Sequence, residues 1–241
     1  MSFIRENIDY KKCFNEYLQN GIVTINNIFH DNFAEDIYKH IIGLEECEWD
    51  AAFPSPPGKE EENSTTIKRI NENYKKIEIR QLENLKKLNN DEFTYRFDRL
   101  NVTHTPGCTC IICSLRETFL KSGHMFSVVS KITGRYDLNH KFTSFISRYR
   151  SNDYLTLHTD TAGSGELKRH VAIIFHLSKD WKPWYGGNLI ITDQDDNVVK
   201  LFTPKFNTLT IMNVEDKKMP HFVSEIANGL DKNRYAISYW M

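Results

Sequence analysis

The sequence predicts a mainly β protein with α-helical parts, of the α+β class, in which N-terminal helices pack on an antiparallel sandwich or barrel. Eight short runs rich in β-branched and aromatic residues follow one another after residue 141, with no helical segment between them. Before residue 141, apolar residues recur mostly at helical spacing. We therefore expect an N-terminal helical extension with a few strands over residues 1–140, packing on a β-rich core over residues 141–241.

The predicted strands of the core are bounded by Gly, Asn, Asp and Pro, residues that favour turns. They span residues 142–150, 153–158, 170–178, 187–193, 198–203, 208–214, 221–226 and 234–240. Short strands at this regular spacing are typical of antiparallel sheets joined by turns, which is why we expect a sandwich or a closed barrel.

The region before residue 141 is predicted to contain helices and strands. Apolar spacing favours helices over 9–20, 31–44, 67–90 and, with a break near Gly123, 114–132; strands are favoured over 22–28 and 93–98. Residues 53–66 contain three prolines and an acidic run, which exclude a regular element. We expect a flexible surface loop there, with a lid over a substrate site as the functional alternative.

Charge and hydropathy exclude some classes of partner. The net charge is −1 over 241 residues, so the chain offers no large basic field for a nucleic acid. No apolar run reaches the roughly 20 residues that cross a bilayer, and the first residues are charged where an export signal needs an apolar stretch. We therefore expect a cytoplasmic protein that binds neither nucleic acid nor membrane.

One short motif points to a metal ion. His158 and Asp160 are two residues apart, so on an extended strand both side chains point to the same side. With His221 as a third ligand, they would form the set of two histidines and one carboxylate that binds non-haem Fe(II) and leaves three coordination positions open. Open positions suit a catalytic centre, so we predict these three residues as catalytic metal ligands.

The last predicted strand divides into two faces. Tyr235, Ile237 and Tyr239 form a face suited to packing on the N-terminal helices, whereas Arg234 and Ser238 lie on the other face. If that second face lines a barrel, the Arg234 guanidinium needs an anion, because a buried unpaired charge is strongly unfavourable. The pattern therefore predicts a carboxylate ligand beside Arg234.

Three of the five cysteines, Cys108, Cys110 and Cys113, are grouped, and His104 precedes them. In a reducing compartment such soft ligands suit a structural zinc ion. The alternative is that these cysteines are small buried apolar side chains, because the spacing lacks the paired Cys-x2-Cys motifs of common zinc modules. Both interpretations stay open at this point.

Taken in order, the motifs of the C-terminal region resemble those of the 2-oxoglutarate- and Fe(II)-dependent dioxygenases. They are RYRSNDYL at 148–155, HTD at 158–160, HVAIIFHLSKDW at 170–181, GGNL at 186–189, His221, and NRYAISYW at 233–240. The resemblance covers about residues 142–241 and is nearest to the prolyl 4-hydroxylase branch. It implies a double-stranded β-helix, a jelly-roll or cupin-like barrel, as the fold of the core.

The resemblance also implies roles for the matching residues. His158, Asp160 and His221 would hold Fe(II), and Arg234 would bind the distal carboxylate of the co-substrate 2-oxoglutarate, with Ser238 adding a hydrogen bond. The interval from His221 to Arg234 is longer than the family's usual one, which we attribute to a longer turn.

Two further residues are assigned to the co-substrate pocket by the same resemblance. Tyr149 matches a tyrosine that lines this pocket in the family. His176 stands where the prolyl hydroxylase branch tends to have a tyrosine, so a histidine hydrogen-bonded within the core is the open alternative.

The implied reaction is the hydroxylation of an unactivated carbon, coupled to the conversion of 2-oxoglutarate and O2 into succinate and CO2, with ascorbate as a candidate reductant. Asp160 favours hydroxylation, because related halogenases need a small residue there. The implied substrate is an amino-acid side chain of the prolyl or lysyl type, either free or in a polypeptide. A free amino acid would need charged partners, for which Arg148, Arg150 and Glu166 are candidates.

Two other classes of function remain as alternatives. A non-catalytic cupin-like barrel would bind a metal or a ligand without turnover, but it leaves Arg234 and Ser238 without a role. A zinc-dependent hydrolase would use the same metal ligands, but no general base stands at a fixed spacing from them.

Overall fold

The computed structural model describes residues 3–54, 65–100, 108–115, 123–138, 144–161, 168–215 and 219–241. Its α-helices are α1 (Tyr10–Asn20), α2 (Asp31–Ile42), α3 (Tyr74–Asn89), α4 (Ile111–Ser114) and α5 (His124–Thr133). Short 3-10 helices are η1 (Glu46–Glu48), η2 (Asn71–Asn73) and η5 (Pro183–Tyr185). Among these described helices, none is long and apolar enough to cross a membrane.

The strands before residue 141 are β1 (Ile22–Asn26), β2 (Asp50–Phe53), β3 (Thr65–Lys68) and β4 (Tyr95–Leu100). The later strands are β5 (Ser144–Tyr149), β6 (Tyr154–His158), β7 (Val171–His176), β8 (Leu189–Thr192), β9 (Val198–Phe202), β10 (Thr208–Asn213), β11 (His221–Val223) and β12 (Arg234–Trp240). All eight strands predicted after residue 141 are therefore present.

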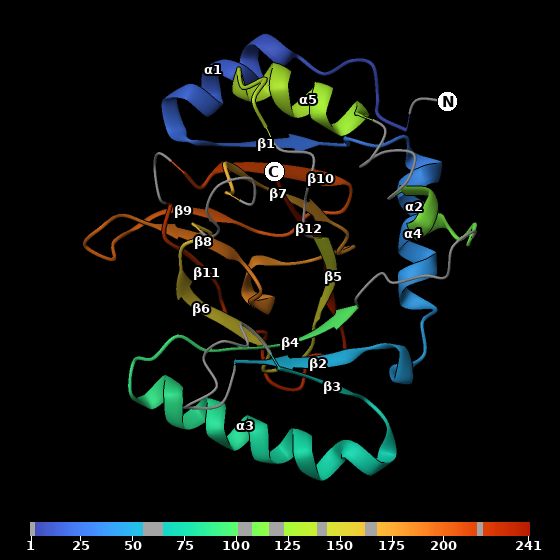
Figure 1. Cartoon of the computed structure of the whole chain (residues 1–241), viewed down its shortest axis with the longest axis vertical. Helices are drawn as coiled ribbons and strands as arrows, with labels where there is room; N and C mark the ends of the chain where they lie inside the picture. The colour runs from blue at the N-terminus through green and yellow to red at the C-terminus, as the bar shows by residue number, and fades with distance from the viewer. Residues whose placement is uncertain are drawn as a thin grey trace.

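The strands form two antiparallel layers, and β4 belongs to both (Figure 1). The layer that we call the major sheet runs β1-β10-β7-β12-β5-β4, with β2 and β3 beyond β4. The minor sheet runs β4-β6-β11-β8-β9. Strand β4 joins the layers because its first half pairs with β6 and its second half with β5. This curled arrangement confirms the predicted α+β class with a double-stranded β-helix core.

The helix predicted over 67–90 is wrong at its N-terminal end. Residues Thr65–Lys68 form β3, which pairs with β2, and helix α3 begins only at Tyr74. The physical reason is that β-branched residues open this stretch and favour pairing with a neighbouring strand over an isolated helical turn. Strand β2 was not predicted, because its four residues are too few to show a period. The predicted loop over 53–66 falls mostly on residues 55–64, which lie outside the described residues.

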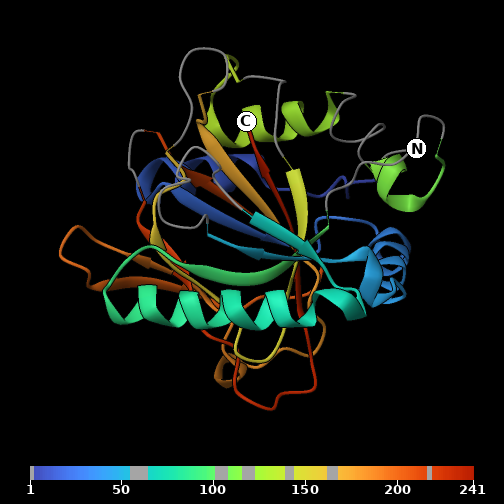
Figure 2. The same cartoon turned by 60° about the horizontal axis from the view of Figure 1, so that its bottom comes forward.

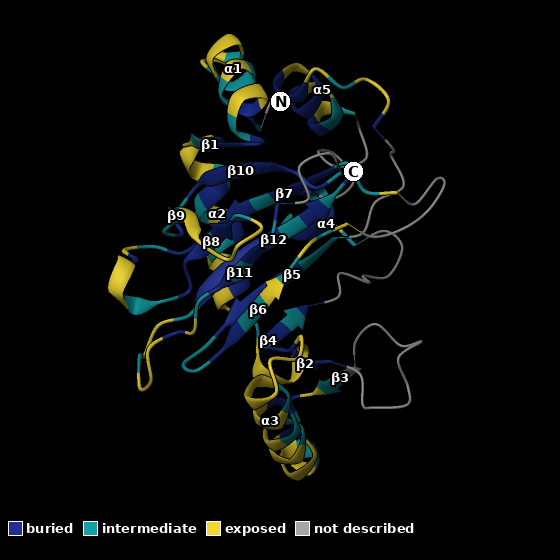
Figure 3. Cartoon of the chain, turned by 90° about the vertical axis from the view of Figure 1, so that its left-hand side faces the viewer, coloured by how far each residue is buried: buried dark blue, intermediate teal, exposed yellow. Residues whose placement is uncertain are grey.

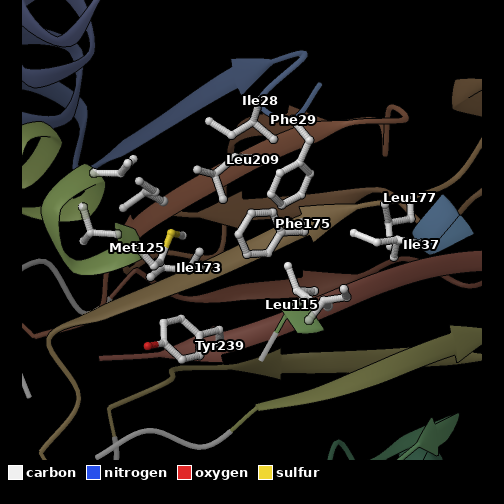
Figure 4. Close-up of a cluster of buried hydrophobic side chains, with 14 of the residues drawn as sticks. Ile28, Phe29, Ile37, Leu115, Met125, Ile173, Phe175, Leu177, Leu209 and Tyr239 are labelled. Atoms are coloured by element: carbon white, nitrogen blue, oxygen red, sulfur yellow. The ribbon is translucent and has the colours of Figure 1, made fainter. Parts of the chain in front are cut away.

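Helices α1, α2 and α5 cover the outer face of the major sheet (Figure 1). Phe29 and Phe175 stack there with ring centroids 5.0 Å apart, beside Ile173 and Leu209 (Figure 4). Tyr239 of β12 points into the same cluster, which confirms the apolar face predicted for the last strand. Full burial of one such side chain stabilises the fold by about 1.5–3 kcal/mol, so this cluster fixes the major sheet against its helices.

Glycines end two of these helices. Gly21 and Gly134 follow α1 and α5, and each has φ of 72°, the left-handed conformation that glycine adopts without a steric penalty. Gly134 also lies close to α1, since a Cβ atom on it would stand 2.8 Å from the ring of Phe14. The two helices can therefore pack side by side over β1 (Figure 1).

Helix α3 lies apart from the other helices, along the β2-β4 edge, and most of its surface is exposed (Figures 2 and 3). Contacts with β2 and β4 help to attach it, among the residues that the structure describes. Ile77 is buried against Ala51 and Phe53, and the Asn84 amide donates to the Tyr95 carbonyl at 2.6 Å. The helix thus supports β4, the strand that joins the two sheets.

A buried ion-pair network connects β4 with its neighbours. Asp98 is fully buried and accepts from Arg69 Nε at 2.5 Å and from Arg148 Nη2 at 2.6 Å. Arg148 also binds both carboxylate oxygens of Glu46, at 2.7 and 2.9 Å. Because each charge in this network has a partner, the network links β3, β4, β5 and η1 without leaving an isolated buried charge.

Candidate functional site

The structure brings together the three predicted metal ligands on neighbouring strands of the minor sheet. His158 ends β6, His221 begins β11, and these two residues face each other in the antiparallel register. Asp160 follows β6 and lies between the two rings: its Oδ1 is 3.6 Å from His158 Nε2 and its Oδ2 is 3.6 Å from His221 Nε2. One donor atom from each side chain lies within 4.8 Å of the others, a spacing that one metal ion could bridge.

Backbone carbonyls orient both imidazole rings. His158 Nδ1 lies 2.9 Å from the Thr156 carbonyl, and His221 Nδ1 lies 2.8 Å from the Met219 carbonyl. Because a carbonyl oxygen only accepts, each Nδ1 must carry the hydrogen, which leaves each Nε2 with a free lone pair directed toward Asp160. This is the arrangement that metal-binding histidines need from their surroundings.

The electrostatics of the site fit a cation. Burial alone would raise the pKa of Asp160, but its close interactions with His158 and His221 outweigh burial and hold the pKa below its usual range. Burial, together with His158, lowers the pKa of His221 to about 4. At neutral pH the site therefore presents a carboxylate and a neutral imidazole, which are the forms that bind metal ions.

A cavity of about 60 Å³ opens beside the three ligands, between the two sheets. This volume accommodates roughly four water molecules, which is the scale of a small organic acid. Its wall is formed mainly by apolar and aromatic side chains, and its polar lining groups come from the residues predicted from the sequence. They are Tyr149, His158, Asp160, His221, Arg234 and Ser238, together with Ser147.

Arg234 places a positive charge in this cavity. Its side chain is 3% exposed, and its Nε is buried without a hydrogen-bond partner. No ion pair joins it to a carboxylate within the described ranges; its guanidinium carbon instead stands 4.8 Å from the centre of the Tyr149 ring. Burial lowers the pKa of Arg234. An unpaired cation at this depth is costly unless an anion binds beside it.

The Gly186-Gly187 pair makes room for this arginine. Gly187 has φ of 65°, and a Cβ atom on it would stand 2.9 Å from Arg234 Cδ and 2.5 Å from Ile226 Cδ1. At Gly186 the same atom would stand 1.8 Å from the Glu225 carbonyl oxygen. Only glycine therefore allows the start of β8 to approach the β11-β12 connection so closely.

His176 does not line the cavity that holds the three ligands. It is 2% exposed, its Nε2 lies 3.1 Å from Thr210 Oγ1, and it borders a separate cavity of about 310 Å³ between β1, β9 and β10. Burial, together with the charge of Arg234, lowers its pKa to about 3. The structure thus places it as a neutral histidine behind Arg234, hydrogen-bonded within the core.

Several wall residues were not predicted from the sequence. Trp240, Phe145, Phe97 and Leu155 all line the cavity. For Trp240 a signal was present, because it continues the alternation of Arg234 and Ser238 along β12. Phe97 had no such signal, since it reaches the cavity only because β4 crosses from one sheet to the other.

The residues considered for a free amino-acid substrate are not collected at this cavity. Arg148 is engaged with Asp98 and Glu46, and Arg150 stands within ion-pair distance of the same two carboxylates. Glu166 lies outside the described residues.

The structure also brings three predicted zinc ligands together. Cys108, Cys110 and Cys113 offer sulfur atoms that all lie within 4.8 Å of one another, at the start of α4. His104, the fourth predicted ligand, lies outside the described residues.

Comparisons with known proteins identify the C-terminal region. Residues 144–241 match the family model of the 2OG-Fe(II) oxygenase superfamily, where 2OG denotes 2-oxoglutarate. A search of curated proteins found no match. The match confirms the resemblance drawn from the sequence, and together with the fold it supports an oxygenase.

Solved structures share the fold at low identity. A prolyl hydroxylase from Trichoplax adhaerens, in complex with a hypoxia-inducible-factor peptide fragment, has 18% identity and a TM-score of 0.62, over 96% of this chain and 87% of that chain. A prolyl-4-hydroxylase from Pseudomonas putida has 11% identity and a TM-score of 0.59, over 96% and 97%. A 2OG-Fe(II) oxygenase family protein from Burkholderia pseudomallei has 11% identity and a TM-score of 0.59, over 98% and 91%.

Proposed function

We propose that this chain, whose residues 144–241 match the family model of the 2OG-Fe(II) oxygenase superfamily, hydroxylates an amino-acid side chain of the prolyl or lysyl type. In this proposal His158, Asp160 and His221 hold Fe(II), and Arg234 with Ser238 binds the distal carboxylate of 2-oxoglutarate. The co-products are succinate and CO2.

The observation that carries the proposal is the buried guanidinium of Arg234, which lies in the same cavity as the three ligands and forms no ion pair with a carboxylate among the described residues. A metal site alone would not require a buried cation beside it. A dicarboxylate that reaches from the metal to Arg234 explains both features, because its distal carboxylate neutralises a charge that the described protein residues leave unpaired. Ser238 lies four residues after Arg234 on β12, so its side chain is on the same face of the strand.

The donor set fits a ferrous ion. Two imidazoles and one carboxylate would hold the ion and would leave coordination positions open for the co-substrate and dioxygen. When bound, iron and 2-oxoglutarate activate O2 and supply the oxidant that hydroxylates the substrate carbon. The Thr156 and Met219 carbonyls would keep both rings in the orientation that binding requires.

The remaining wall would exclude water from the reaction. Phe97, Phe145 and Trp240 surround the ligands with apolar surface, and ring centroids of Phe145 and Trp240 are 5.5 Å apart. An apolar wall limits hydrolytic and other side reactions and strengthens the charge interactions inside the cavity.

A polypeptide substrate has more support than a free amino acid. Arg148 is paired with Asp98 and Glu46, and Arg150 lies within ion-pair distance of the same two carboxylates, so both guanidiniums already face anions of the protein. At the same time an apolar side chain is exposed beside the site: Phe93 is 48% exposed, and its ring centroid lies 5.7 Å from that of His158. Exposed apolar residues next to a reaction centre suit a peptide that passes over it.

The experiment is a measurement of succinate formation by protein reconstituted anaerobically with Fe(II) and then exposed to O2 and 2-oxoglutarate. The panel contains proline- and lysine-containing peptides and the corresponding free amino acids, with and without ascorbate. We expect peptide-stimulated turnover that is lost in Asp160→Ala and in Arg234→Ala. Metal binding without turnover on any compound would instead favour a non-catalytic barrel.

A further inference from the structure

We propose that Cys108, Cys110 and Cys113 bind a zinc ion with a structural role, at a site separate from the predicted iron centre. The assignment uses cysteines that the oxygenase chemistry does not need. It does not rest on the proposed reaction, and the two sites can be removed independently.

The geometry of the three cysteines is close to that of a thiolate site. Their sulfur atoms all lie within 4.8 Å of one another. With Zn–S bonds of about 2.3 Å, sulfur atoms in a tetrahedral site are separated by about 3.8 Å, so only a small contraction is needed around an ion. Within the described ranges no other His, Cys, Asp or Glu joins this group, and a water molecule can take the fourth position around zinc.

Local structure explains why these three side chains converge. Cys110 caps helix α4 at its N-terminus, and its sulfur accepts the backbone N–H of Cys113 at 3.5 Å. Residues three apart lie on the same side of a helical turn, which brings Cys113 back toward Cys110. Cys108 enters from the extended residues just before the helix. The convergence is therefore built by backbone that the structure describes.

The cysteine site lies at a short helix that is attached to the core by a few buried apolar side chains. Helix α4 has four residues, far fewer than an isolated helix needs for stability in water. It packs beside α2 (Figure 1), and Ile112 and Leu115 belong to the cluster on the outer face of the major sheet, where Figure 4 shows Leu115. A bound zinc ion would fix this short segment against the sheet, as structural zinc ions do in small modules.

The predicted iron centre and the cysteine site differ in place and in chemistry. The three iron ligands belong to the minor sheet and face the cavity between the sheets, whereas α4 packs on the outer face of the major sheet. Thiolates select zinc and other soft ions, and imidazole with carboxylate suits ferrous iron. The competing outcome is a disulfide between two of the cysteines. The purified protein would then contain this cross-link in place of a zinc ion bound by the thiolates.

The test is elemental analysis of the full-length protein purified under reducing conditions without chelator, after expression with added zinc. We expect about one zinc per chain. Cys108→Ser and Cys110→Ser should lose most of it; Cys110→Ser is the sharper variant, because serine keeps the hydrogen-bond acceptor at the helix N-terminus. Cys47→Ser, at an exposed free cysteine, is the matched control and should keep the zinc.

Two further measurements separate zinc bound by the cysteines from metal bound by the predicted iron ligands. His158→Ala should keep the cysteine-bound zinc while losing the predicted iron ligand set, which separates this site from the oxygenase chemistry. Replacement of zinc by Co(II) should give a thiolate-to-cobalt absorption band that is absent in Cys110→Ser. The proposal is overturned if wild-type protein holds no zinc under these conditions, if Cys110→Ser holds as much as wild type, or if mass spectrometry finds a disulfide within 108–113 in the reduced preparation.

Discussion

Arg234 stands opposite Tyr149 in the antiparallel pairing of β12 with β5, and its guanidinium carbon lies 4.8 Å from the centre of the Tyr149 ring. The strand register thus places a cation over an aromatic face inside the cavity. A cation–π contact of this kind contributes about 0.5–2 kcal/mol, less than the cost of burying the charge. The tyrosine can therefore orient the guanidinium, but a bound anion is needed to neutralise it.

The close approach of Gly187 to Arg234 predicts a specific loss of co-substrate binding. A methyl group at Gly187 would meet Arg234 Cδ and Ile226 Cδ1, whereas one at Gly229 would meet nothing within 4 Å. Both glycines have positive φ, so alanine at either position costs about 1–2 kcal/mol of backbone strain. We expect Gly187→Ala to weaken 2-oxoglutarate binding as well, measured by calorimetry, while Gly229→Ala changes stability alone. Equal 2-oxoglutarate affinities in the two variants would argue against this account.

Removing the charge of Asp160 should abolish tight metal binding. Asp160→Asn keeps the size of the side chain but replaces an anionic ligand by a neutral amide. We expect the affinity for Mn(II) or Fe(II), measured by anaerobic titration, to fall by more than about 100-fold, because changes merely outside the ligand shell already cost 10- to 100-fold. Asp195→Asn, at an exposed carboxylate, is the control. An unchanged metal affinity in Asp160→Asn would exclude this residue as a ligand.

The buried neutral His176 should make the protein less stable in acid. Its pKa is about 3 in the folded state and near 6.5 when exposed, so between these values the unfolded chain binds a proton that the folded chain does not. Stability therefore falls as the pH decreases from about 6.5 to 3, by up to about 1.4 kcal/mol per pH unit for this group.

The variant His176→Gln isolates this contribution, because glutamine keeps hydrogen-bonding capacity toward Thr210 but does not titrate. Urea unfolding at several pH values should show a shallower loss of stability in acid for His176→Gln than for wild type. His30→Gln, at an exposed histidine, should leave the slope unchanged. Identical acid slopes in wild type and His176→Gln would contradict the assignment of His176 as a neutral core residue.

The ion-pair network around Asp98 predicts a large effect on stability from a single substitution. Asp98→Asn would leave Arg69 and Arg148 without their shared buried carboxylate, and breaking a buried pair costs about 3–5 kcal/mol. The partly exposed pair of Arg80 and Glu83 is the comparison, and Glu83→Gln should cost less than about 1 kcal/mol. Chemical unfolding measures both. A loss below 1 kcal/mol in Asp98→Asn would show that the network does not stabilise β4.

Side-chain alternation within a strand could be predicted from the sequence, whereas contacts that depend on how distant strands are arranged could not. The alternation along β12 placed Arg234 and Ser238 on the cavity side and Tyr239 in the core, because a strand has a fixed period of two. The role of Phe97 could not be predicted, since it depends on β4 passing from one sheet to the other. The ion pairs of Arg148 could not be predicted either, because its partners Asp98 and Glu46 are distant in sequence. The sequence assigns His176 of β7 to the co-substrate pocket, but in the structure it borders the separate cavity between β1, β9 and β10.

In the proposed reaction, one metal ion and one dicarboxylate share the cavity beside Arg234. The most direct test of this arrangement is the titration of 2-oxoglutarate into anaerobic protein, with and without Mn(II), for wild type and Arg234→Gln. We predict that the metal tightens 2-oxoglutarate binding in wild type, and that Arg234→Gln weakens it by about 30-fold or more, corresponding to about 2 kcal/mol, while Mn(II) affinity is unchanged. If 2-oxoglutarate binds Arg234→Gln as tightly as wild type, or binds wild type equally well without metal, the account is contradicted.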